Sequence, residues 1–255
     1  MLRPRIVCSL LMASEDLVKT KNFSDPVYIG DPINTVRIFN EKKVDEIFLM
    51  DMDAYKNDQI NFDILEKIAS ISRMPICYGG GIKTKDQIER ILSLGIEKVS
   101  LNTSLFQEKG LELLNESTNF FGSQSITVCL DIKKNKNEYE IYNKNILPKS
   151  NMISFMNKII NCKIGEIIIQ SVDQDGNMNG FDIQLLSQIS KLTKNIPLTI
   201  LGGAGSIDDL IKVSKKFNIS GYGCGSIFCF KQKRGTVLIN YFKNDEKRKI
   251  KFLKN

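Results

Sequence analysis

Residues 196–206 read I-P-L-T-I-L-G-G-A-G-S, an apolar run typical of a β-strand that ends in a glycine-rich turn. Ser206 then starts an amphipathic segment, so the stretch predicts a strand, a tight turn and the beginning of a helix. In that arrangement several backbone N–H groups point at one place and can bind an anion. Residues 74–88 read M-P-I-C-Y-G-G-G-I-K-T-K-D-Q-I and repeat the pattern, with Gly81 and Gly203 lying 122 positions apart. We therefore expect two homologous halves, each with one anion-binding turn.

The rest of the chain alternates between apolar, strand-like runs and helical segments. Such alternation predicts parallel βαβ units, and eight of them in 255 residues predict a (β/α)8 TIM barrel built from two homologous half-barrels. A doubly wound sheet is the alternative, but two equal halves close on each other more naturally as a barrel. One domain is expected over residues 1–242, with its last helix at 235–242, before a loosely held basic tail at 243–255. Apart from the strands that lead into the two glycine turns, strands are expected at 5–11, 44–51, 99–101, 126–131, 164–170 and 221–225.

Composition excludes several kinds of chemistry. The chain has no histidine, which rules out Ser-His-Asp and Cys-His catalysis. Its six cysteines show no metal-ligand spacing, so we expect no metal site. The net charge of +7 comes largely from the C-terminal tail and is accompanied by no nucleic-acid-binding motif. Without a signal peptide or a bilayer-long apolar run, a cytoplasmic protein with no membrane or nucleic-acid partner is expected.

Motifs along nearly the whole chain resemble one known family. They include G-D-P at 30–32, K-V-S-L-N-T at 98–103, F-G-S-Q at 121–124, L-D-I-K at 130–133 and G-E-I-I-I-Q-S-V-D-Q-D-G at 165–176. Together with the glycine turns, they resemble the cyclase subunit of imidazole glycerol phosphate synthase over residues 1 to about 242. The resemblance implies a barrel that receives ammonia from a separate glutaminase subunit. It further implies a long ligand with a phosphate at each end, and no cofactor.

The repeat by itself already indicates a ligand with two phosphates, or one long ligand held at both ends. Gly81 and Gly203 end their strands, and the next strand in each half is followed by a hydroxyl side chain, Thr103 or Ser226. The alternative is that these glycines only make tight turns, but the matching hydroxyls argue for binding. By resemblance, the phosphate loops comprise Gly81, Asn102 and Thr103 in the first half and Asp175, Gly176, Gly203, Gly225 and Ser226 in the second, while Lys19, Asp51 and Ser171 belong to the active-site surroundings.

The strand-end acid and base of the family are only half present. The resemblance implies two catalytic aspartates, at the ends of the first and fifth strands. The fifth strand keeps its aspartate, Asp131, but the internal repeat places Leu11 where the first strand should carry the other. A leucine side chain cannot transfer a proton. Two further positions in the active-site surroundings depart from the family pattern. Gln170 stands where the family has a threonine, and Thr20 stands where it has a glycine.

Four charged residues stand just before apolar strand runs, at the opposite end of the predicted barrel. They are two cations and two anions: Arg5, Glu46, Lys98 and Glu166. If all four point inward they form a ring, which the resemblance identifies as the gate through which ammonia enters from the docked glutaminase. The alternative is a salt-bridged plug that only stabilises this end.

Three functions follow from these patterns. One is a paralogue that keeps the gate and delivers ammonia to a third protein, for amidation of a surface-polysaccharide sugar. Leu11 and the absence of histidine favour it. A second is the histidine-pathway cyclase itself, a lyase that makes imidazole glycerol phosphate and an aminoimidazole carboxamide ribotide, and the family resemblance favours that. The third is a scaffold that binds a phosphorylated ligand or a glutaminase without turnover.

Overall fold

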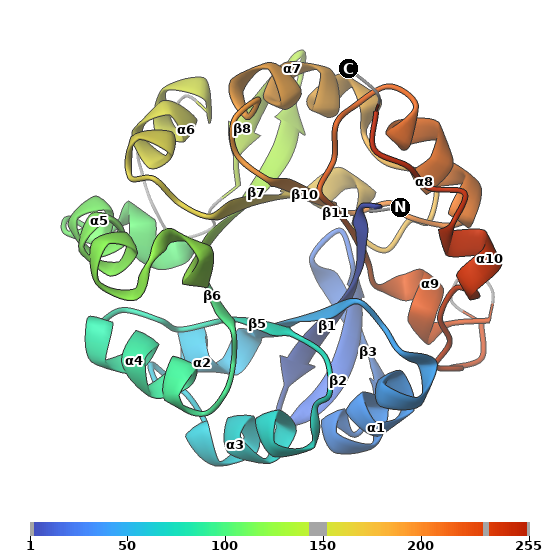
Figure 1. The fold of residues 1–255 in the computed structure, drawn as a ribbon, viewed down its shortest axis with the longest axis horizontal. Coiled ribbons are helices and arrows are strands. Elements are labelled where there is room, and N and C mark those ends of the chain that lie inside the picture. The colour runs from blue at the N-terminus through green and yellow to red at the C-terminus, as the bar shows by residue number, and fades with distance from the viewer. Residues whose placement is uncertain (1–2, 143–151, 232–234, 254–255) are drawn as a thin grey trace.

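The computed structural model describes residues 3–142, 152–231 and 235–253. Within them, eight strands pair in parallel and close into a barrel, since β1 pairs with both β4 and β11. Figure 1 shows this barrel end-on, with helices around it. The prediction of a (β/α)8 TIM barrel is confirmed. The barrel strands are β1 (Arg5–Ala13), β4 (Glu46–Asp51), β5 (Ile76–Gly79), β6 (Lys98–Leu101), β7 (Ile126–Asn135), β9 (Glu166–Ser171), β10 (Leu198–Leu201) and β11 (Gly221–Cys224).

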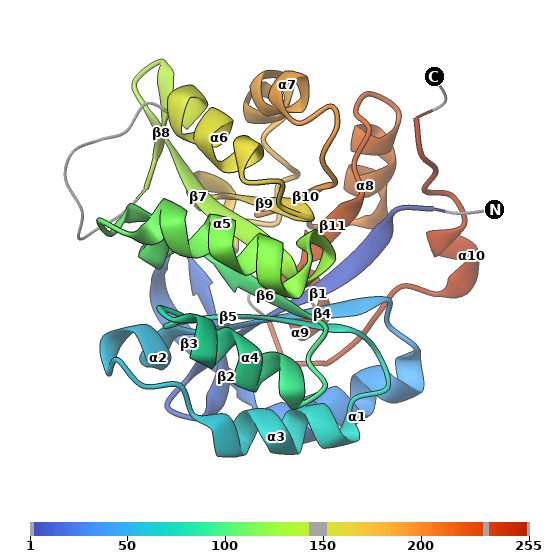
Figure 2. The same ribbon diagram turned by 60° about the vertical axis from the view of Figure 1, so that its left-hand side comes forward.

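Helices that follow the barrel strands form the outer layer (Figures 1 and 2). Most of the longer ones start at a side-chain cap, which accepts hydrogen bonds from N–H groups left free in the first turn. Thr84 and Ser206, which the repeat pairs, both form capping boxes. The internal repeat therefore extends to the helix starts. The layer comprises α1 (Pro32–Lys42), α3 (Phe62–Ile71), α4 (Lys85–Ser93), α5 (Gly110–Phe121), α6 (Met152–Asn161), α7 (Ile183–Leu192) and α8 (Ile207–Ser214), with short helices α2 (Met52–Lys56), α9 (Ser226–Cys229) and α10 (Asn244–Lys247) and three 3₁₀ turns, η1 (Thr103–Phe106), η2 (Ser123–Ser125) and η3 (Val172–Gln174).

The helix expected at 235–242 is absent, and that prediction is wrong. This segment is extended, with a β-bridge between Phe230 and Val237. Its three β-branched residues, Thr236, Val237 and Ile239, favour extended backbone over helix. Aromatic side chains take over the covering role of the missing helix, since Tyr241 packs against Phe228 at a ring-centroid distance of 4.9 Å.

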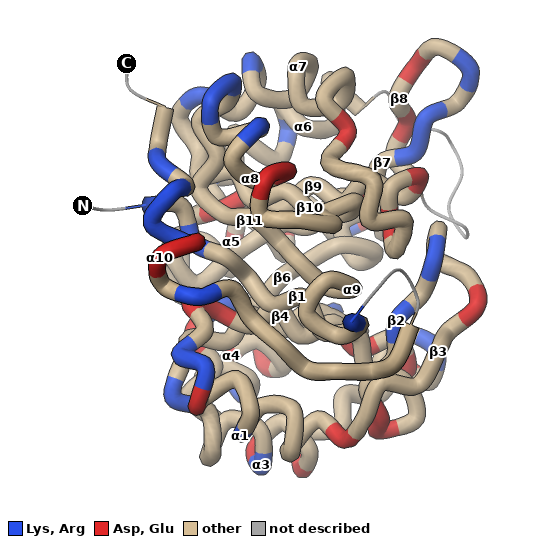
Figure 3. Tube along the Cα trace, turned by 90° about the vertical axis from the view of Figure 1, so that its right-hand side faces the viewer, with Lys and Arg blue, Asp and Glu red and all other residues tan. Residues whose placement is uncertain are grey.

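The basic tail is held against the barrel rather than loosely attached, which corrects that expectation. Tyr241 Oη donates a hydrogen bond of 3.0 Å to the carbonyl of Ile6. Ile250 is fully buried, and Lys247 is buried beside Asp45. The lysines and arginines of residues 243–251 lie in and around α10 in Figure 3. No helix among the described residues is long and apolar enough to cross a membrane.

Two hairpins extend beyond the C-terminal ends of the barrel strands (Figure 2). β2 (Asp16–Lys21) and β3 (Ser24–Gly30) form an antiparallel pair beside β1, whereas residues 12–30, rich in polar side chains, predict a loop from the sequence. β8 (Glu138–Ile141) pairs with β7, which confirms the hairpin that the short alternating run at 139–142 predicts within residues 133–145. The last residues of that predicted hairpin segment, 143–145, lie outside the described residues. The end of the barrel that bears these hairpins is called the mouth below, and the opposite end the floor.

The barrel interior holds a small apolar core of its own. Side chains alternate between the two faces of a strand, so every second residue points inward. The inward residues midway along the barrel form a compact cluster separate from the larger core under the helices. Polar and charged groups are thereby confined to the two ends. This inner core consists of Val7, Phe48, Cys77, Cys129, Ile168 and Leu201, with Met50 packed against it.

Candidate active site

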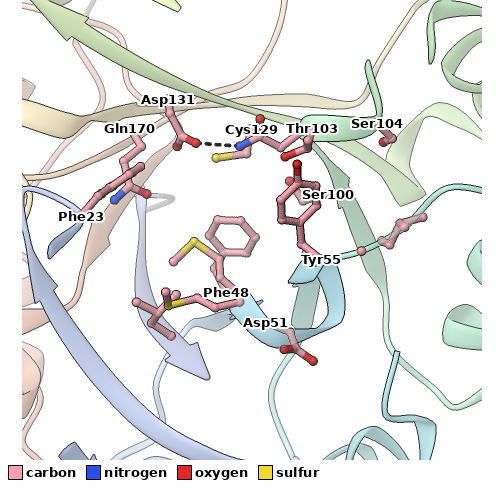
Figure 4. A pocket seen from close by; sticks show the side chains of 18 of the residues that line it. Phe23, Phe48, Asp51, Tyr55, Ser100, Thr103, Ser104, Cys129, Asp131 and Gln170 are labelled. Atoms are coloured by element: carbon pink, nitrogen blue, oxygen red, sulfur yellow. Dashed lines mark hydrogen bonds between the residues drawn. The ribbon is translucent and has the colours of Figure 1, made fainter. Parts of the chain in front are cut away.

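A cavity of about 440 Å³ opens at the mouth, and Figure 4 shows the side chains around it. The apolar side chains that line it include Leu11, Phe48, Met50 and Cys129. Its polar groups include residues at the ends of β4, β6, β7 and β9, in α2 and in the β2–β3 hairpin. The C-terminal ends of the strands are where a (β/α)8 barrel carries its chemistry. This cavity is therefore the candidate active site.

Asp131 lines this cavity from β7. Its side chain accepts a hydrogen bond of 2.9 Å from Asn102 Nδ2, drawn in Figure 4. Burial raises the pKa of Asp131 to about 7, the Asn102 hydrogen bond opposes this rise, and the negative charge of Asp175 adds to it. A carboxyl group with that pKa exists in both protonation states at neutral pH and can give or take a proton. The geometry thus suits Asp131 to acid–base work.

Leu11 lines the same cavity from β1, so the position that the repeat pairs with Asp131 is apolar in space as well as in sequence. Asp51 is also a cavity residue, but its carboxylate caps α2. It accepts from the backbone N–H groups of Asp53 and Ala54 at 2.9 and 3.0 Å. Burial raises the pKa of Asp51, and these hydrogen bonds act against the rise. In Figure 4 Asp51 points away from Asp131.

The glycine turn of the first half lies on the wall of the mouth cavity. Gly81 has a φ of 65°, and a Cβ there would come within 2.6 Å of the Ala54 carbonyl oxygen, so only glycine fits. Asn102 and Thr103 line the same wall. Ser100 is buried beside them, and its hydroxyl has no hydrogen-bond partner among the described residues. The close approach to α2 explains why Gly81 is glycine, while the adjoining polar groups leave room for an anion.

The glycine turn of the second half borders a separate cavity of about 30 Å³. Lys19 lies in it, buried, and donates a hydrogen bond to the carbonyl of Ser9. A Cβ on Gly225 would come within 2.5 Å of Lys19 Nζ, so glycine is needed there for the lysine to fit. Ser171 lines neither cavity; its buried hydroxyl has no partner among the described residues. The expected residues that do line this small cavity are Lys19, Asp175, Gly176, Gly203, Gly225 and Ser226.

Four charged side chains meet at the floor, and they are the four singled out in the sequence. Arg5 Nη2 lies 2.6 Å and Lys98 Nζ 2.8 Å from the Glu166 carboxylate. Both cations also pair with Glu46, which closes the ring. Burial acts to raise the pKa of Glu166, but Lys98 and Arg5 outweigh it, so this pKa lies below its ordinary value. These four residues are called the floor ring below.

Sequence reasoning missed an aromatic rim over the mouth cavity. Phe23, in the turn of the β2–β3 hairpin, packs edge-on against Tyr142 with ring centroids 5.8 Å apart. Tyr55, after β4, lines the cavity from the first half. Alternation in D-L-V-K-T-K and P-V-Y-I-G was the available signal for the hairpin. The alternation in these two runs is too short to predict the hairpin, and so the position of Phe23 could not be predicted.

Comparison with known proteins agrees with this geometry. The family model described as "Histidine biosynthesis protein" matches residues 5–234. The chain belongs to this histidine biosynthesis protein family. The resemblance to imidazole glycerol phosphate synthase is thereby confirmed at the level of the family.

Relatives within the histidine biosynthesis protein family cover almost the whole chain. The "Putative imidazole glycerol phosphate synthase subunit hisF3" of Vibrio vulnificus is 42% identical over 98% of this chain and 96% of its own length. The "Putative imidazole glycerol phosphate synthase subunit hisF2" of Pseudomonas aeruginosa is 40% identical over 94% of this chain and 96% of its own. The "Imidazole glycerol phosphate synthase subunit HisF" of Natranaerobius thermophilus is 34% identical, again over 94% and 96%.

Proposed function

We propose that this chain is the barrel subunit of a glutamine amidotransferase complex, which receives ammonia at its floor from a glutaminase partner. In this proposal it is a paralogue of the cyclase subunit and passes the ammonia on to a third protein, for amidation of a surface-polysaccharide sugar. The observation that carries the proposal is the contrast between a complete floor ring and a mouth with one of two expected aspartates. No metal or cofactor is part of this proposal, since the chain itself only passes ammonia on and the acceptor group would be activated at the third protein.

The mouth has the means to handle one proton at a time. Asp131, with a pKa of about 7, can take up a proton or release one. Ring closure of the family's substrate requires an acid and a base on opposite sides of the ligand, as the resemblance implies. Leu11 lines the cavity where the second carboxylate belongs and can do neither. Loss of one member of an acid–base pair lowers the rate by roughly 10²–10⁴-fold.

The floor ring and the inner core together support passage of ammonia. Ammonia is neutral and small, so an apolar interior admits it more readily than the ammonium ion. The inner core lies directly between the floor ring and the mouth cavity. Arg5, a third exposed, gives the ring one side chain that solvent or a docked partner can reach. If the ring were only a stabilising plug, substitutions in it would have no effect on glutamine-dependent activity.

Ligand binding at the mouth is part of the proposal. A phosphate would bind in the small cavity of the second half, beside Lys19 and the Gly203 turn. The other phosphate of a bisphosphorylated ligand would bind near Gly81 and Thr103 in the mouth cavity. Aligned N–H groups at both glycine turns favour negative charge. The cytoplasm, where small phosphorylated metabolites are abundant, is the expected location.

The second candidate is the histidine-pathway cyclase itself. Family membership and the names of the relatives favour it. Against it stand Leu11 and the higher identity to relatives named "putative" subunits hisF3 and hisF2 than to the one named HisF without that qualifier. The two candidates share the floor ring and differ only in the chemistry at the mouth.

An ammonia-dependent cyclase assay separates them. The purified chain, its Leu11→Asp variant and an Asp131→Asn variant are each supplied with the family's substrate and free ammonia. We expect little or no turnover from the unmodified chain and partial recovery with Leu11→Asp. Asp131→Asn should remove whatever activity there is. Normal turnover by the unmodified chain contradicts the paralogue and returns the function to histidine biosynthesis.

The same preparations are then tested for complex formation with a glutaminase encoded by the same organism. Binding should survive Leu11→Asp and Asp131→Asn, because the floor does not depend on the mouth. Substitution of Arg5→Glu should weaken it. Phosphate binding without glutaminase binding or turnover would instead support the scaffold.

A further inference from the structure

One carboxylate joins the β2–β3 hairpin to the barrel. Asp175, in the loop after β9, accepts a hydrogen bond of 2.8 Å from Thr20 Oγ1 and one of 3.3 Å from the Phe23 N–H. Its own backbone carbonyl accepts from the Asn22 N–H at 3.0 Å. Gln170, at the end of β9, donates to the other carboxylate oxygen of Asp175 at 3.4 Å. The hairpin and the strand end are thus tied to the same side chain.

The two side chains that bind Asp175, Thr20 and Gln170, stand at two of the three positions where the sequence departs from the pattern of the family it resembles, Leu11 being the third. Both are buried. A glycine at position 20 would have no hydroxyl to donate. A threonine at position 170 is two bonds shorter than glutamine and would have a shorter reach toward Asp175. The two departures therefore act on one carboxylate and form a single arrangement.

The hairpin turn also carries strain that something must offset. Asn22 and Phe23 have φ values of 51° and 61°, the left-handed conformation that a two-residue hairpin turn requires. Phenylalanine adopts it at a cost of about 1 kcal/mol or more, and such residues persist where the surroundings hold them. Here the Phe23 N–H binds Asp175 and its ring packs on Tyr142. Figure 4 shows Phe23 beside Gln170 at the edge of the cavity.

We propose that Thr20 and Gln170 are positioning residues, which hold the hairpin over the mouth through Asp175 and so keep Lys19 in the small cavity as a fixed cation for one phosphate group. Lys19 directly precedes Thr20 in β2. Its amino group donates to the Ser9 carbonyl while the hairpin is in the position that Asp175 holds. The role of Lys19 rests on the phosphate binding proposed above. The fastening of the hairpin does not.

Amide hydrogen exchange of the intact chain, followed by mass spectrometry, tests the fastening. Thr20→Val removes the hydroxyl at nearly constant size, and Thr20→Ser keeps it. Thr20→Val should raise the exchange rate of residues 16–30 roughly ten-fold, because hydrogen bonds to a charged group are the stronger kind. Thr20→Ser should restore the rate of the unmodified chain. Ser24→Ala is the matched control, since it removes a hydroxyl from the same hairpin that bonds only within it, at Lys21 and Asp25.

A double-mutant cycle tests whether the residues act through Asp175. In an Asp175→Ala background, Thr20→Val and Gln170→Leu should add no further exchange. Additive effects would show that they act independently and would overturn the proposal. Unchanged exchange in Thr20→Val would overturn it as well.

Calorimetric titration with inorganic phosphate tests the role of Lys19. Thr20→Val and Lys19→Met should both weaken phosphate binding, roughly three- to ten-fold for the former, while Ser24→Ala should not. A hairpin that opens without any change in phosphate affinity contradicts the positioning of Lys19. Failure of the unmodified chain to bind phosphate contradicts the proposed ligand and leaves the exchange experiment to decide the fastening.

Discussion

The two ends of the barrel shift the pKa of a carboxylate in opposite directions. At the floor, the pKa of Glu166 is held below its ordinary value although the side chain is almost fully buried. At the mouth, the pKa of Asp131 is raised to about 7. Burial acts in the same direction on both, so the difference comes from the neighbours: two cations for Glu166, and the neutral amide of Asn102 for Asp131.

Because of this difference, the charges at the floor balance one another, whereas the carboxylate at the mouth can exchange a proton near neutral pH. In the floor ring each carboxylate contacts both cations. With its pKa lowered by these two cations, Glu166 stays ionised over the whole physiological pH range. The side chain of Asp131 is bonded to the neutral amide of Asn102, and no cation is among its described contacts. Asp131 at the mouth can therefore change protonation state near neutral pH, and Glu166 at the floor cannot.

The largest effect, a loss in the free energy of unfolding, is expected when one cation is removed from the floor ring. Lys98→Met leaves Glu46 and Glu166 with only Arg5 between them. Removal of one partner from a buried ionic group costs roughly 3–5 kcal/mol, and we expect about 3 kcal/mol because Arg5 stays. Urea unfolding at pH 7 measures the loss. Lys83→Met is the control: Lys83 pairs with a largely exposed Asp58, so its loss should cost less than about 1 kcal/mol.

The pH dependence of that loss checks the cause. Glu166 has a lower pKa folded than unfolded, so its ionisation stabilises the fold above its ordinary pKa of 4.5, and this contribution disappears as the pH falls. The difference between the unmodified chain and Lys98→Met should therefore shrink below about pH 4.5. A difference that stays constant on acidification would mean that lost packing, rather than lost charge pairing, dominates.

At the mouth, an intermediate effect of opposite sign is expected: replacing Asp131 should increase the free energy of unfolding. Asp131 has a higher pKa folded, about 7, than its ordinary 3.8, so its ionisation opposes folding increasingly as the pH rises between these values. Asp131→Asn keeps an acceptor for Asn102 and removes the charge. The shift corresponds to at most about 4 kcal/mol, and we expect a gain of about 2 kcal/mol at pH 8, since the residue is partly exposed.

Urea unfolding midpoints at pH 4.5 and pH 8 measure this gain. At the lower pH Asp131 is largely protonated in the folded chain, so Asp131→Asn should be close to neutral there. Equal effects at both pH values would contradict the raised pKa of Asp131.

The smallest effect is expected from Asn102→Ala. The Asn102 hydrogen bond favours the ionised form of Asp131, so its loss should raise that pKa by up to about one unit, given roughly 1 kcal/mol for a hydrogen bond. Carbon-13 NMR of the Asp131 carboxyl group follows the titration. Asn40→Ala, which removes an amide bonded to the Ile71 carbonyl, should leave it unchanged. A lowered pKa in Asn102→Ala would show that Asn102 does not stabilise the charge.

The sequence determined what depends on local pattern and on the internal repeat. Apolar runs, caps and glycine turns recur at fixed spacing, so the barrel, its two halves and the strand ends followed from them. Residues at equivalent ends of parallel strands meet, and for this reason Arg5, Glu46, Lys98 and Glu166 could be placed together before any coordinates. Leu11 was placed opposite Asp131 by the same rule.

Tertiary structure alone decided what depends on contacts between distant segments. The segment 235–242 follows the β preference of its residues because Tyr241 and Phe228 can cover the barrel without a helix. The hairpin lies over the mouth because Asp175 holds Thr20, a contact across 155 positions that no periodicity encodes. The pKa of Asp131 is likewise set by the depth of burial and by the absence of a nearby cation among its described contacts. These are long-range packing and electrostatic effects, and they exist only once the chain has closed into a barrel.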